Sequence, residues 1–242
     1  MMQSPPELDL PKFLTAERHA IHLIGVAGSG MSGIAALLIE LGHDVRGSDK
    51  ARTLETERLS CLGLRAFSPH RPEDASDAEL IIYSSAIKED NPILMDARRR
   101  SVPVIRRAEA LAAIMQGKRG IIIAGMHGKT TTSAMAAHVL RGGGLHPSHY
   151  VGAEIPILGS NAHWDSLGEY FVAEGDESDG TLQFFHPEYA LILNVEEEHL
   201  DYYKDLAAIE EVFSRLLRQT TGVVFFCADD PNAPRICARH AR

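Results

Sequence analysis

The stretch GIIIAGMHGKTTTSA, residues 120–134, decides the fold of the second half of this 242-residue chain. An apolar run is followed at once by two glycines, a lysine and a run of threonines. This order predicts a buried β-strand that ends in a tight turn and continues into an α-helix. The N–H groups of such a turn, the helix N-terminus and the lysine ammonium can hold phosphate oxygens. The stretch therefore predicts a site for a nucleoside triphosphate.

The candidate ligands for ATP and Mg²⁺ come from this loop and the first turn of its helix. The general phosphate-loop pattern GxxxxGK[ST] has a glycine at the position of Ile123, so this chain departs from it. An ordinary glycine turn before a helix is the alternative, but strand, Gly-Lys pair, threonine run and helix all coincide. The residues expected to bind ATP are Gly125, Met126, His127, Gly128, Lys129, Thr130 and Thr131.

Outward from this loop, short apolar runs alternate with helical stretches along the whole chain. Before it we expect strands at 21–25, 44–49, 79–86 and 102–105, with helices at 31–42, 53–63, 91–100 and 107–115. After it we expect strands at 169–176, 189–195 and 222–230 and a helix at 205–217. This alternation predicts an α/β protein with a Rossmann-like, doubly wound parallel sheet, followed by a P-loop ATPase α/β domain.

The segment MQGKRG, residues 115–120, interrupts the alternation and marks the expected domain boundary. We therefore expect one domain over 1–117 and a second over 118–242. Only residues 233–242 follow the motif DDPN. We expect the second domain to be incomplete, its sheet to leave apolar surface exposed, and the chain to turn over barely if at all.

Composition limits the classes of function. The formal net charge is −9 and the pI about 5.7, which argues against a general nucleic-acid binder. No apolar run is long enough for a membrane span, and the start of the chain lacks the pattern of a signal peptide. Cys61, Cys227 and Cys237 are scattered and lack CxxC spacing, as in reduced, cytoplasmic proteins.

A second glycine loop, GVAGSGMSG at residues 25–33, lies between the first expected strand and helix. Gly28, Gly30 and Gly33 match GxGxxG, and Asp49 follows at the end of the next strand, where an acid can accept a hydrogen bond from a ribose. In a dinucleotide-binding alignment, however, Ala27 stands where the second glycine belongs. We expect this loop to bind a nucleotide diphosphate; a tight turn without ligand is the alternative.

Further short motifs follow these loops in a fixed order. They are HLIGVAGSGMSGIAALL (22–38), GSD (47–49), SSAI with NP (84–92), VPVIRRAE (102–109), GMHGKTTT (125–132), NA (161–162), AEGDESDG (173–180), NVEEEHLD (194–201) and DDPN (229–232). Together they resemble the Mur ligase family over nearly the whole chain, and within it the members that add L-alanine to UDP-N-acetylmuramate. Ala27 and Glu198 are departures, since the family typically has glycine and aspartate there.

The resemblance implies that the first domain binds UDP-N-acetylmuramate and the second binds ATP with Mg²⁺. The lactyl carboxylate would take the γ-phosphoryl group of ATP, and the amine of L-alanine would displace phosphate from the acyl-phosphate. Positioning and charge neutralisation would supply most of the catalysis.

The resemblance also implies roles for individual residues. Lys129 would contact the ATP phosphates, Thr130 and Glu174 would bind Mg²⁺, and His199 would bind a second Mg²⁺; Glu177 is a less favoured ligand than Glu174. The expected UDP-sugar residues are Gly28, Ser29, Gly30, Met31, Ser32, Asp49, Ser84, Ser85 and Arg106. For Ser84, Ser85 and Arg106, helix caps and a surface charge are an equal alternative.

Three other functions stay open at this point. A ligase that attaches a whole tripeptide to UDP-N-acetylmuramate would share the fold and most motifs. An NAD-dependent oxidoreductase would explain the first glycine loop but not Lys129, Glu174 or His199. The chain could also be a binding fragment without catalysis.

Overall fold

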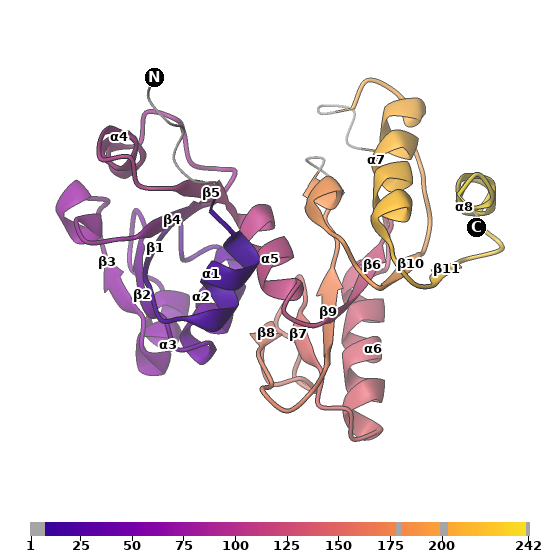
Figure 1. Cartoon of the computed structure of the whole chain (residues 1–242), viewed down its shortest axis with the longest axis horizontal. Coiled ribbons are helices and arrows are strands. Elements are labelled where there is room, and N and C mark those ends of the chain that lie inside the picture. The colour runs from indigo at the N-terminus through magenta and orange to yellow at the C-terminus, as the bar shows by residue number, and fades with distance from the viewer. Residues whose placement is uncertain (1–7, 178–180, 199–202, 241–242) are drawn as a thin grey trace. The chain divides into compact units, whose positions relative to one another are not determined.

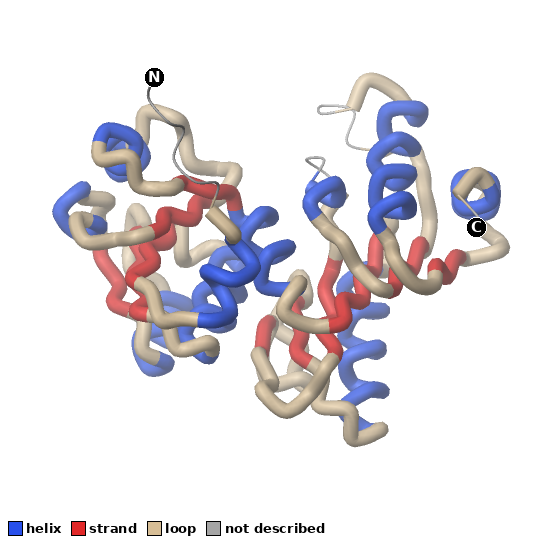
Figure 2. The backbone as a smooth tube through the Cα atoms, in the orientation of Figure 1, coloured by secondary structure: helices blue, strands red, loops and turns tan. Residues whose placement is uncertain are grey.

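A computed structural model of the chain describes residues 8–177, 181–198 and 203–240. The chain divides into two compact units, Met1–Gly117 and Lys118–Arg242. Each unit has one β-sheet with helices on both of its faces (Figure 1, Figure 2). The α/β fold class expected from the sequence is therefore confirmed.

The sheet of the first unit has five parallel strands in the order β3-β2-β1-β4-β5. They are β1 (Ala20–Ile24), β2 (Asp44–Ser48), β3 (Arg65–Phe67), β4 (Leu80–Tyr83) and β5 (Val104–Arg106). The chain adds strands outward from β1 on one side and then restarts at β4 on the other. In open parallel sheets, this reversal opens a crevice at the carboxyl ends of the two central strands, where ligands bind.

Helices cover both faces of this sheet, as the doubly wound prediction requires (Figure 1). They are α1 (Leu10–Ala16), α2 (Ser29–Glu40), α3 (Leu54–Leu62), α4 (Pro92–Arg99) and α5 (Arg107–Met115), with a 3₁₀ turn η1 (Pro72–Ala75). On one face, Ile93 and Leu94 of α4 pack against Ile81 of β4 in a fully buried cluster. The opposite face carries α2, α3 and α5. Burial on both faces explains why the strands are nearly continuous apolar runs.

The sheet of the second unit has six strands in the order β11-β10-β6-β9-β7-β8. They are β6 (Arg119–Ala124), β7 (Ser148–Tyr150), β8 (Ala162–His163), β9 (Tyr170–Glu174), β10 (Tyr189–Ile192) and β11 (Val224–Phe226). The sheet is mixed, because β7 and β8 pair antiparallel while the other described pairs are parallel. Neither β7 nor β8 is predicted from the sequence.

Helix α6 (Lys129–Gly142) covers one face of this second sheet, while α7 (Leu206–Gln219) lies on the other with the 3₁₀ turn η2 (Thr181–Phe184) (Figure 1). A short helix, α8 (Ala233–Ala238), packs beside α7. Ala134 and Ala137 of α6 pack on Ile123 and Val172 of the central strands. Small residues on α6 let the helix approach the sheet closely, which fixes the position of its N-terminus.

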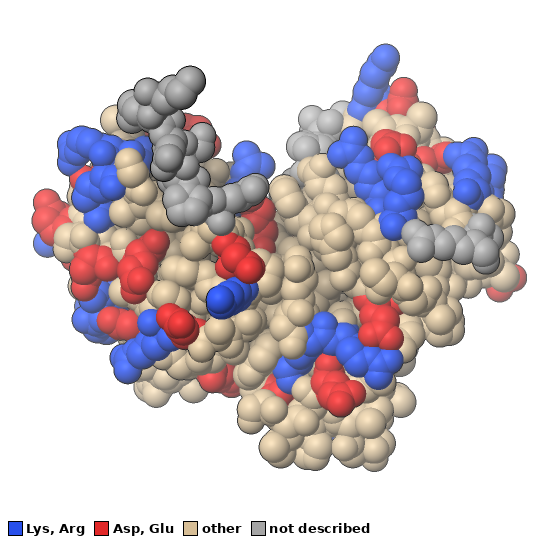
Figure 3. All heavy atoms as spheres, in the orientation of Figure 1, with Lys and Arg blue, Asp and Glu red and all other residues tan. Residues whose placement is uncertain are grey.

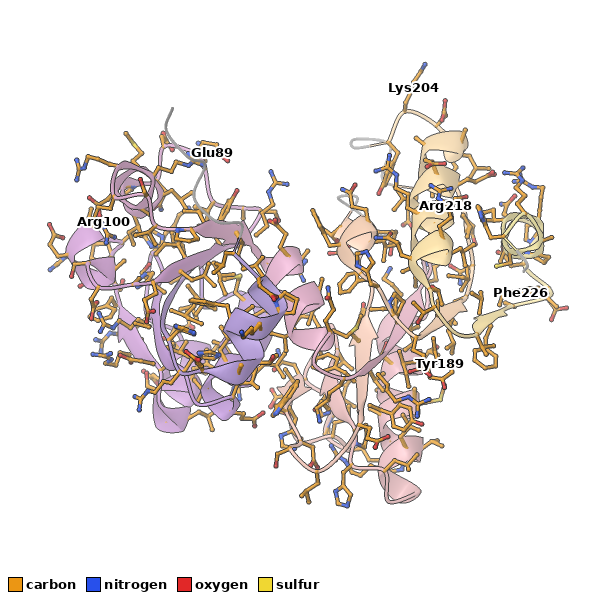
Figure 4. All side chains as sticks on the ribbon, viewed as in Figure 1. Glu89, Arg100, Tyr189, Lys204, Arg218 and Phe226 are labelled. Carbon is orange, nitrogen blue, oxygen red and sulfur yellow. The ribbon has the colours of Figure 1, made fainter. Side chains whose placement is uncertain are left out.

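Strand β11 forms an edge of the sheet and is shorter than the expected 222–230. Phe225 is 53% exposed and Phe226 44% exposed, and Figure 4 shows Phe226 at this edge. Acidic and basic side chains are interspersed on the face drawn in Figure 3, without a broad basic surface. No helix in the described ranges is long and apolar enough to cross a membrane.

Candidate functional site

The loop between β6 and α6 has the backbone shape that its glycines predict. Ile123 is fully buried inside β6, so the loop begins only at Gly125. Gly125 has φ +147° and Gly128 has φ +84°, both in the region that favours glycine. Gly128 is the N-cap of α6, and no side chain caps this helix end. The first N–H groups of α6 therefore lack a side-chain partner, which is the arrangement that binds anions.

Asn194, which follows β10, holds this loop from the neighbouring strand. Its side-chain oxygen accepts from the His127 N–H at 2.8 Å, and its amide nitrogen donates to the His127 carbonyl at 3.0 Å. The Met126 N–H also donates to the Asn194 carbonyl at 3.4 Å. A Cβ on Gly125 would lie 3.0 Å from the Asn194 backbone nitrogen. Asn194 therefore fixes the loop conformation, a role that the sequence did not reveal.

Lys129 folds back over the loop. Its ammonium donates to the Gly125 carbonyl at 2.6 Å and to a carboxylate oxygen of Glu177 at 2.8 Å. The Glu177 side chain is only 1% exposed. Burial raises the pKa of Glu177, although the neighbouring Lys129 ammonium opposes that shift. Glu177 thus lies beside the phosphate-loop lysine as its buried partner.

Thr130 and Glu174 meet although 44 residues separate them in the chain. The Thr130 hydroxyl donates to Oε2 of Glu174 at 2.9 Å, and the Gly152 N–H donates to the same oxygen at 2.7 Å. A Cβ on Gly152 would lie 2.6 Å from that oxygen, so the backbone there approaches closely. The hydroxyl and carboxylate are hard oxygen donors, the type that Mg²⁺ prefers.

The other expected residues of this site are placed as follows. His127 and Thr131 are exposed, whereas Met126 is 6% exposed and can contribute only its backbone. His199 lies outside the described residues. The carboxyl ends of β6, β9 and β10 thus bring together the phosphate loop, Glu174 and Asn194.

The first glycine loop lies between β1 and α2. Gly25 has φ +84°, and the Gly28 N–H donates to the Gly25 carbonyl at 3.3 Å, which closes the turn. Gly28 is the N-cap of α2 without a side-chain cap. Gly28 and Ser29 are exposed. This loop therefore presents a second helix N-terminus suited to a phosphate group.

Asp49 follows β2 directly and holds that loop. Its Oδ2 accepts from the Ala27 N–H at 2.9 Å, and its Oδ1 accepts from the Lys50 N–H at 2.7 Å. Each carboxylate oxygen can accept more than one hydrogen bond. Asp49 can therefore anchor the loop and still accept a hydrogen bond from a ribose hydroxyl.

The remaining candidate residues of the first unit differ in exposure and in their distance from this loop. Ser84 follows β4 and lies under Gly25, where an added Cβ would be 3.4 Å from the Ser84 Cβ. Ser85 and Arg106 are exposed at the ends of β4 and β5. Met31 and Ser32 are 2% and 1% exposed, inside the core beneath the loop. The exposed and half-buried candidates lie at the carboxyl ends of β1, β2, β4 and β5, around the reversal of strand order.

Comparisons with known protein families identify both units. Residues 20–119 match the model described as Mur ligase family, catalytic domain, and residues 123–242 match the Mur ligase middle domain. The UDP-N-acetylmuramate–L-alanine ligase of Rubrobacter xylanophilus is 45% identical over 218 residues, which are 89% of this chain and 48% of that protein. The corresponding ligase of Pelotomaculum thermopropionicum is 42% identical over 228 residues, 93% of this chain and 49% of that one. The chain thus spans about half the length of the curated relatives it matches.

Solved structures agree with this result. The UDP-N-acetylmuramate–alanine ligase of Thermotoga maritima superposes with a TM-score of 0.81 and 30% identity, covering 93% of this chain and 51% of that one. A UDP-N-acetylmuramate:L-alanyl-γ-D-glutamyl-meso-diaminopimelate ligase from Neisseria meningitides gives a TM-score of 0.84 at 25% identity, covering 92% of this chain and 75% of that one.

Proposed function

The chain belongs to the Mur ligase family, and from this we propose that it provides the UDP-N-acetylmuramate and ATP sites of a cytoplasmic, ATP-dependent L-alanine ligase of peptidoglycan precursor synthesis. The observation that carries the proposal is the pairing of Thr130 with Glu174 next to Lys129 at one phosphate loop. Hydride transfer by an NAD-dependent oxidoreductase does not require a phosphate-loop lysine beside a threonine–glutamate pair. The curated relatives named above favour L-alanine as the amino acid.

In the first step, a carboxylate oxygen of the muramyl lactyl group attacks the γ-phosphorus of ATP. The bond from that phosphorus to the bridging oxygen breaks, and ADP leaves. The N–H groups at the start of α6 and the Lys129 ammonium bind the oxygens on which negative charge collects. The Lys129 ammonium is held within reach of the loop by its contacts with Glu177 and the Gly125 carbonyl. When ATP binds, phosphate oxygens would replace these contacts.

Mg²⁺ would be held by the Thr130 hydroxyl and the Glu174 carboxylate, with His199 proposed for a second ion. The donor set fits, because two hard oxygen ligands already lie 2.9 Å apart. When bound, the ion neutralises phosphate charge. Gly152 keeps Glu174 pointed at Thr130, since its N–H donates to the carboxylate and a side chain there would collide with it.

In the second step, the amine of L-alanine attacks the acyl carbon, the C–O bond to phosphate breaks, and the amine loses a proton. The first glycine loop would hold the diphosphate of UDP-N-acetylmuramate at the N-terminus of α2, through Gly28, Ser29 and Gly30. Asp49 would accept from the ribose, and Ser84, Ser85 and Arg106 lie at the ends of the next strands.

A thermal-shift panel on the whole chain tests the proposal. UDP-N-acetylmuramate and Mg-ATP should each raise the melting temperature, and NAD should not. Stabilisation by NAD alone would replace the proposal with an oxidoreductase. Because we expect this chain to turn over barely if at all, a single-turnover product assay with L-alanine and with the tripeptide in parallel separates the two ligase reactions; product from the tripeptide alone would favour the recycling reaction.

A further inference from the structure

The motif DDPN, residues 229–232, lies between β11 and α8, outside the phosphate loop. Two of its side chains contact Val195, which follows Asn194 after the end of β10. The Val195 N–H donates to Oδ2 of Asp230 at 3.4 Å, and the Asn232 side-chain amide donates to the Val195 carbonyl at 2.7 Å. Val195 is fully buried and Asp230 is 9% exposed. Both polar groups of the Val195 backbone are therefore held by side chains from one loop.

The two side chains are themselves fixed by the start of α8. The other carboxylate oxygen of Asp230, Oδ1, accepts from the Asn232 N–H at 3.0 Å and from the Ala233 N–H at 2.7 Å. The Asn232 side-chain oxygen accepts from Arg235 at 3.1 Å, which leaves the amide nitrogen directed at Val195. A buried carboxylate that accepts from several backbone N–H groups has little freedom to move, because each lost bond leaves a polar group unpaired. The motif is therefore a fixed point against which Val195 is held.

The peptide bond between Asn194 and Val195 connects Asp230 to the phosphate loop. Its N–H donates to Asp230, and its carbonyl, that of Asn194, accepts from the Met126 N–H at 3.4 Å. In a planar trans peptide the N–H and the carbonyl point in opposite directions. Asp230 and Met126 thus bind opposite edges of one peptide plane, and rotation of this plane would break both hydrogen bonds. Acceptance by a carboxylate also polarises the peptide, which strengthens its carbonyl as an acceptor.

Asn194 extends this connection to the next residue of the loop. Its side chain pairs with both the N–H and the carbonyl of His127, at 2.8 and 3.0 Å. Met126 and His127 directly precede Gly128, the N-cap of α6, where the N–H groups of the helix would bind phosphate. A change in the orientation of the 194–195 peptide would therefore move the loop away from the conformation that binds phosphate.

We propose that Asp230 and Asn232 are positioning residues for ATP: they hold the Asn194–Val195 peptide, and Asn194 in turn holds the phosphate loop in its binding conformation. The inference rests on the proposed function, since it requires ATP at this loop. Both residues act through Asn194 and not by contact with the nucleotide. Their replacement should therefore weaken ATP binding without removing a phosphate ligand, and the effect should depend on the presence of Asn194.

Calorimetry with Mg-ATP on the whole chain tests this. Asn232→Ala removes the donor to the Val195 carbonyl and should weaken Mg-ATP binding about 3- to 10-fold, the equivalent of one or two hydrogen bonds. Asp230→Asn keeps an oxygen for the N–H groups of α8 but turns an NH₂ group toward the Val195 N–H, so it should have a similar effect. Asp229→Asn, at an exposed position of the same motif, is the matched control and should bind Mg-ATP as the unchanged chain does. UDP-N-acetylmuramate affinity should stay the same in all three variants.

A double-mutant cycle separates positioning from general stabilisation. Asn194→Ala removes both side-chain contacts with His127 and should weaken Mg-ATP binding about 10- to 100-fold. In that background, Asn232→Ala should weaken binding at most about twofold more, because only the Met126 bond still connects the motif to the loop. The same loss in both backgrounds would overturn the proposal, since Asn232 would then act independently of Asn194.

Hydrogen exchange of the Met126 and His127 amides gives a readout at the loop itself. Both amides should exchange faster in Asn232→Ala and Asp230→Asn than in Asp229→Asn, although all three substitutions lie in another segment of the chain. Unchanged Mg-ATP affinity in Asn232→Ala and Asp230→Asn would overturn the proposal and leave the proposed function standing. Absence of Mg-ATP binding to the unchanged chain would overturn both.

Discussion

The Thr130 hydroxyl donates a hydrogen bond of 2.9 Å to Oε2 of Glu174, which joins the start of α6 to the end of β9. The partners are neighbours in space because β9 pairs in parallel with β6, with Ile123 opposite Glu174. The last residue of β9 therefore lies beside the phosphate loop. A carboxylate and a hydroxyl in this position would supply two hard oxygen ligands to a bound Mg²⁺.

Thr130→Val should reduce the Mg²⁺ dependence of ATP affinity while preserving side-chain size. The valine lacks the oxygen, so added Mg²⁺ should improve ATP binding much less than in the unchanged chain. Glu174→Gln should act in the same way, and the double variant should be non-additive by about 0.5–3 kcal/mol, as for groups that share one ligand. Calorimetry with ATP, with and without Mg²⁺, is the measurement. Thr132→Val, two residues along α6, is the control; if it has the same effect, the helix rather than the ligand set is responsible.

Lys129→Ala should weaken Mg-ATP binding by about 10- to 100-fold and leave UDP-N-acetylmuramate affinity unchanged. The ammonium is a charge-assisted donor worth about 1.5–3 kcal/mol, and alanine supplies no substitute. Lys204→Ala is the matched control, since Lys204 is exposed in the same unit (Figure 4). Equal loss of both ligands in Lys129→Ala would indicate a folding defect, which circular dichroism would reveal.

The loop between β6 and α6 was predicted nearly to the residue because its signals are local. An apolar run, two glycines and a threonine-rich helix each mark one boundary. The short strands β7 and β8 were missed for the opposite reason. Each has two or three residues, His149 and His163 interrupt the apolar pattern, and the pairing partner rather than local propensity makes them strands.

Contacts between distant segments explain what the sequence left out of the site. Asn194 can hydrogen-bond to the phosphate loop only because β10 lies next to β6. The order of strands in a sheet cannot be deduced from the residues of a single strand, so this contact was not predicted. The spacing of Asp49 from the glycine loop suggested a ribose ligand. Its hydrogen bond from the Ala27 N–H shows that Asp49 also stabilises the loop, which the spacing does not indicate.

Gly125→Ala should destabilise the second unit and impair ATP binding. Gly125 has φ +147°, which costs an L-residue on the order of 1–3 kcal/mol, and its new Cβ would lie 3.0 Å from the Asn194 backbone. Gly142→Ala is the control, because that glycine has space around it and ends α6. Thermal melts and ATP titrations of both variants make the comparison. Equal melting temperatures for the two would contradict the close-approach argument.

The last prediction concerns pH and His22. Burial lowers the pKa of His22 to about 4, against an ordinary value of 6.5. Between these values the unfolded chain binds more protons than the folded one, so stability rises with pH across this window and is lost as pH falls from 6.5 toward 4. The contribution is up to about 3 kcal/mol.

His22→Gln cannot take up the proton, so its free energy of unfolding should change less between pH 6.5 and 4 than that of the unchanged chain. His43 and His70 have lowered pKa values with the same sign, so the difference between variants, measured by urea unfolding at each pH, is the relevant quantity. Parallel profiles for His22→Gln and the unchanged chain would show that His22 is not buried in its neutral form.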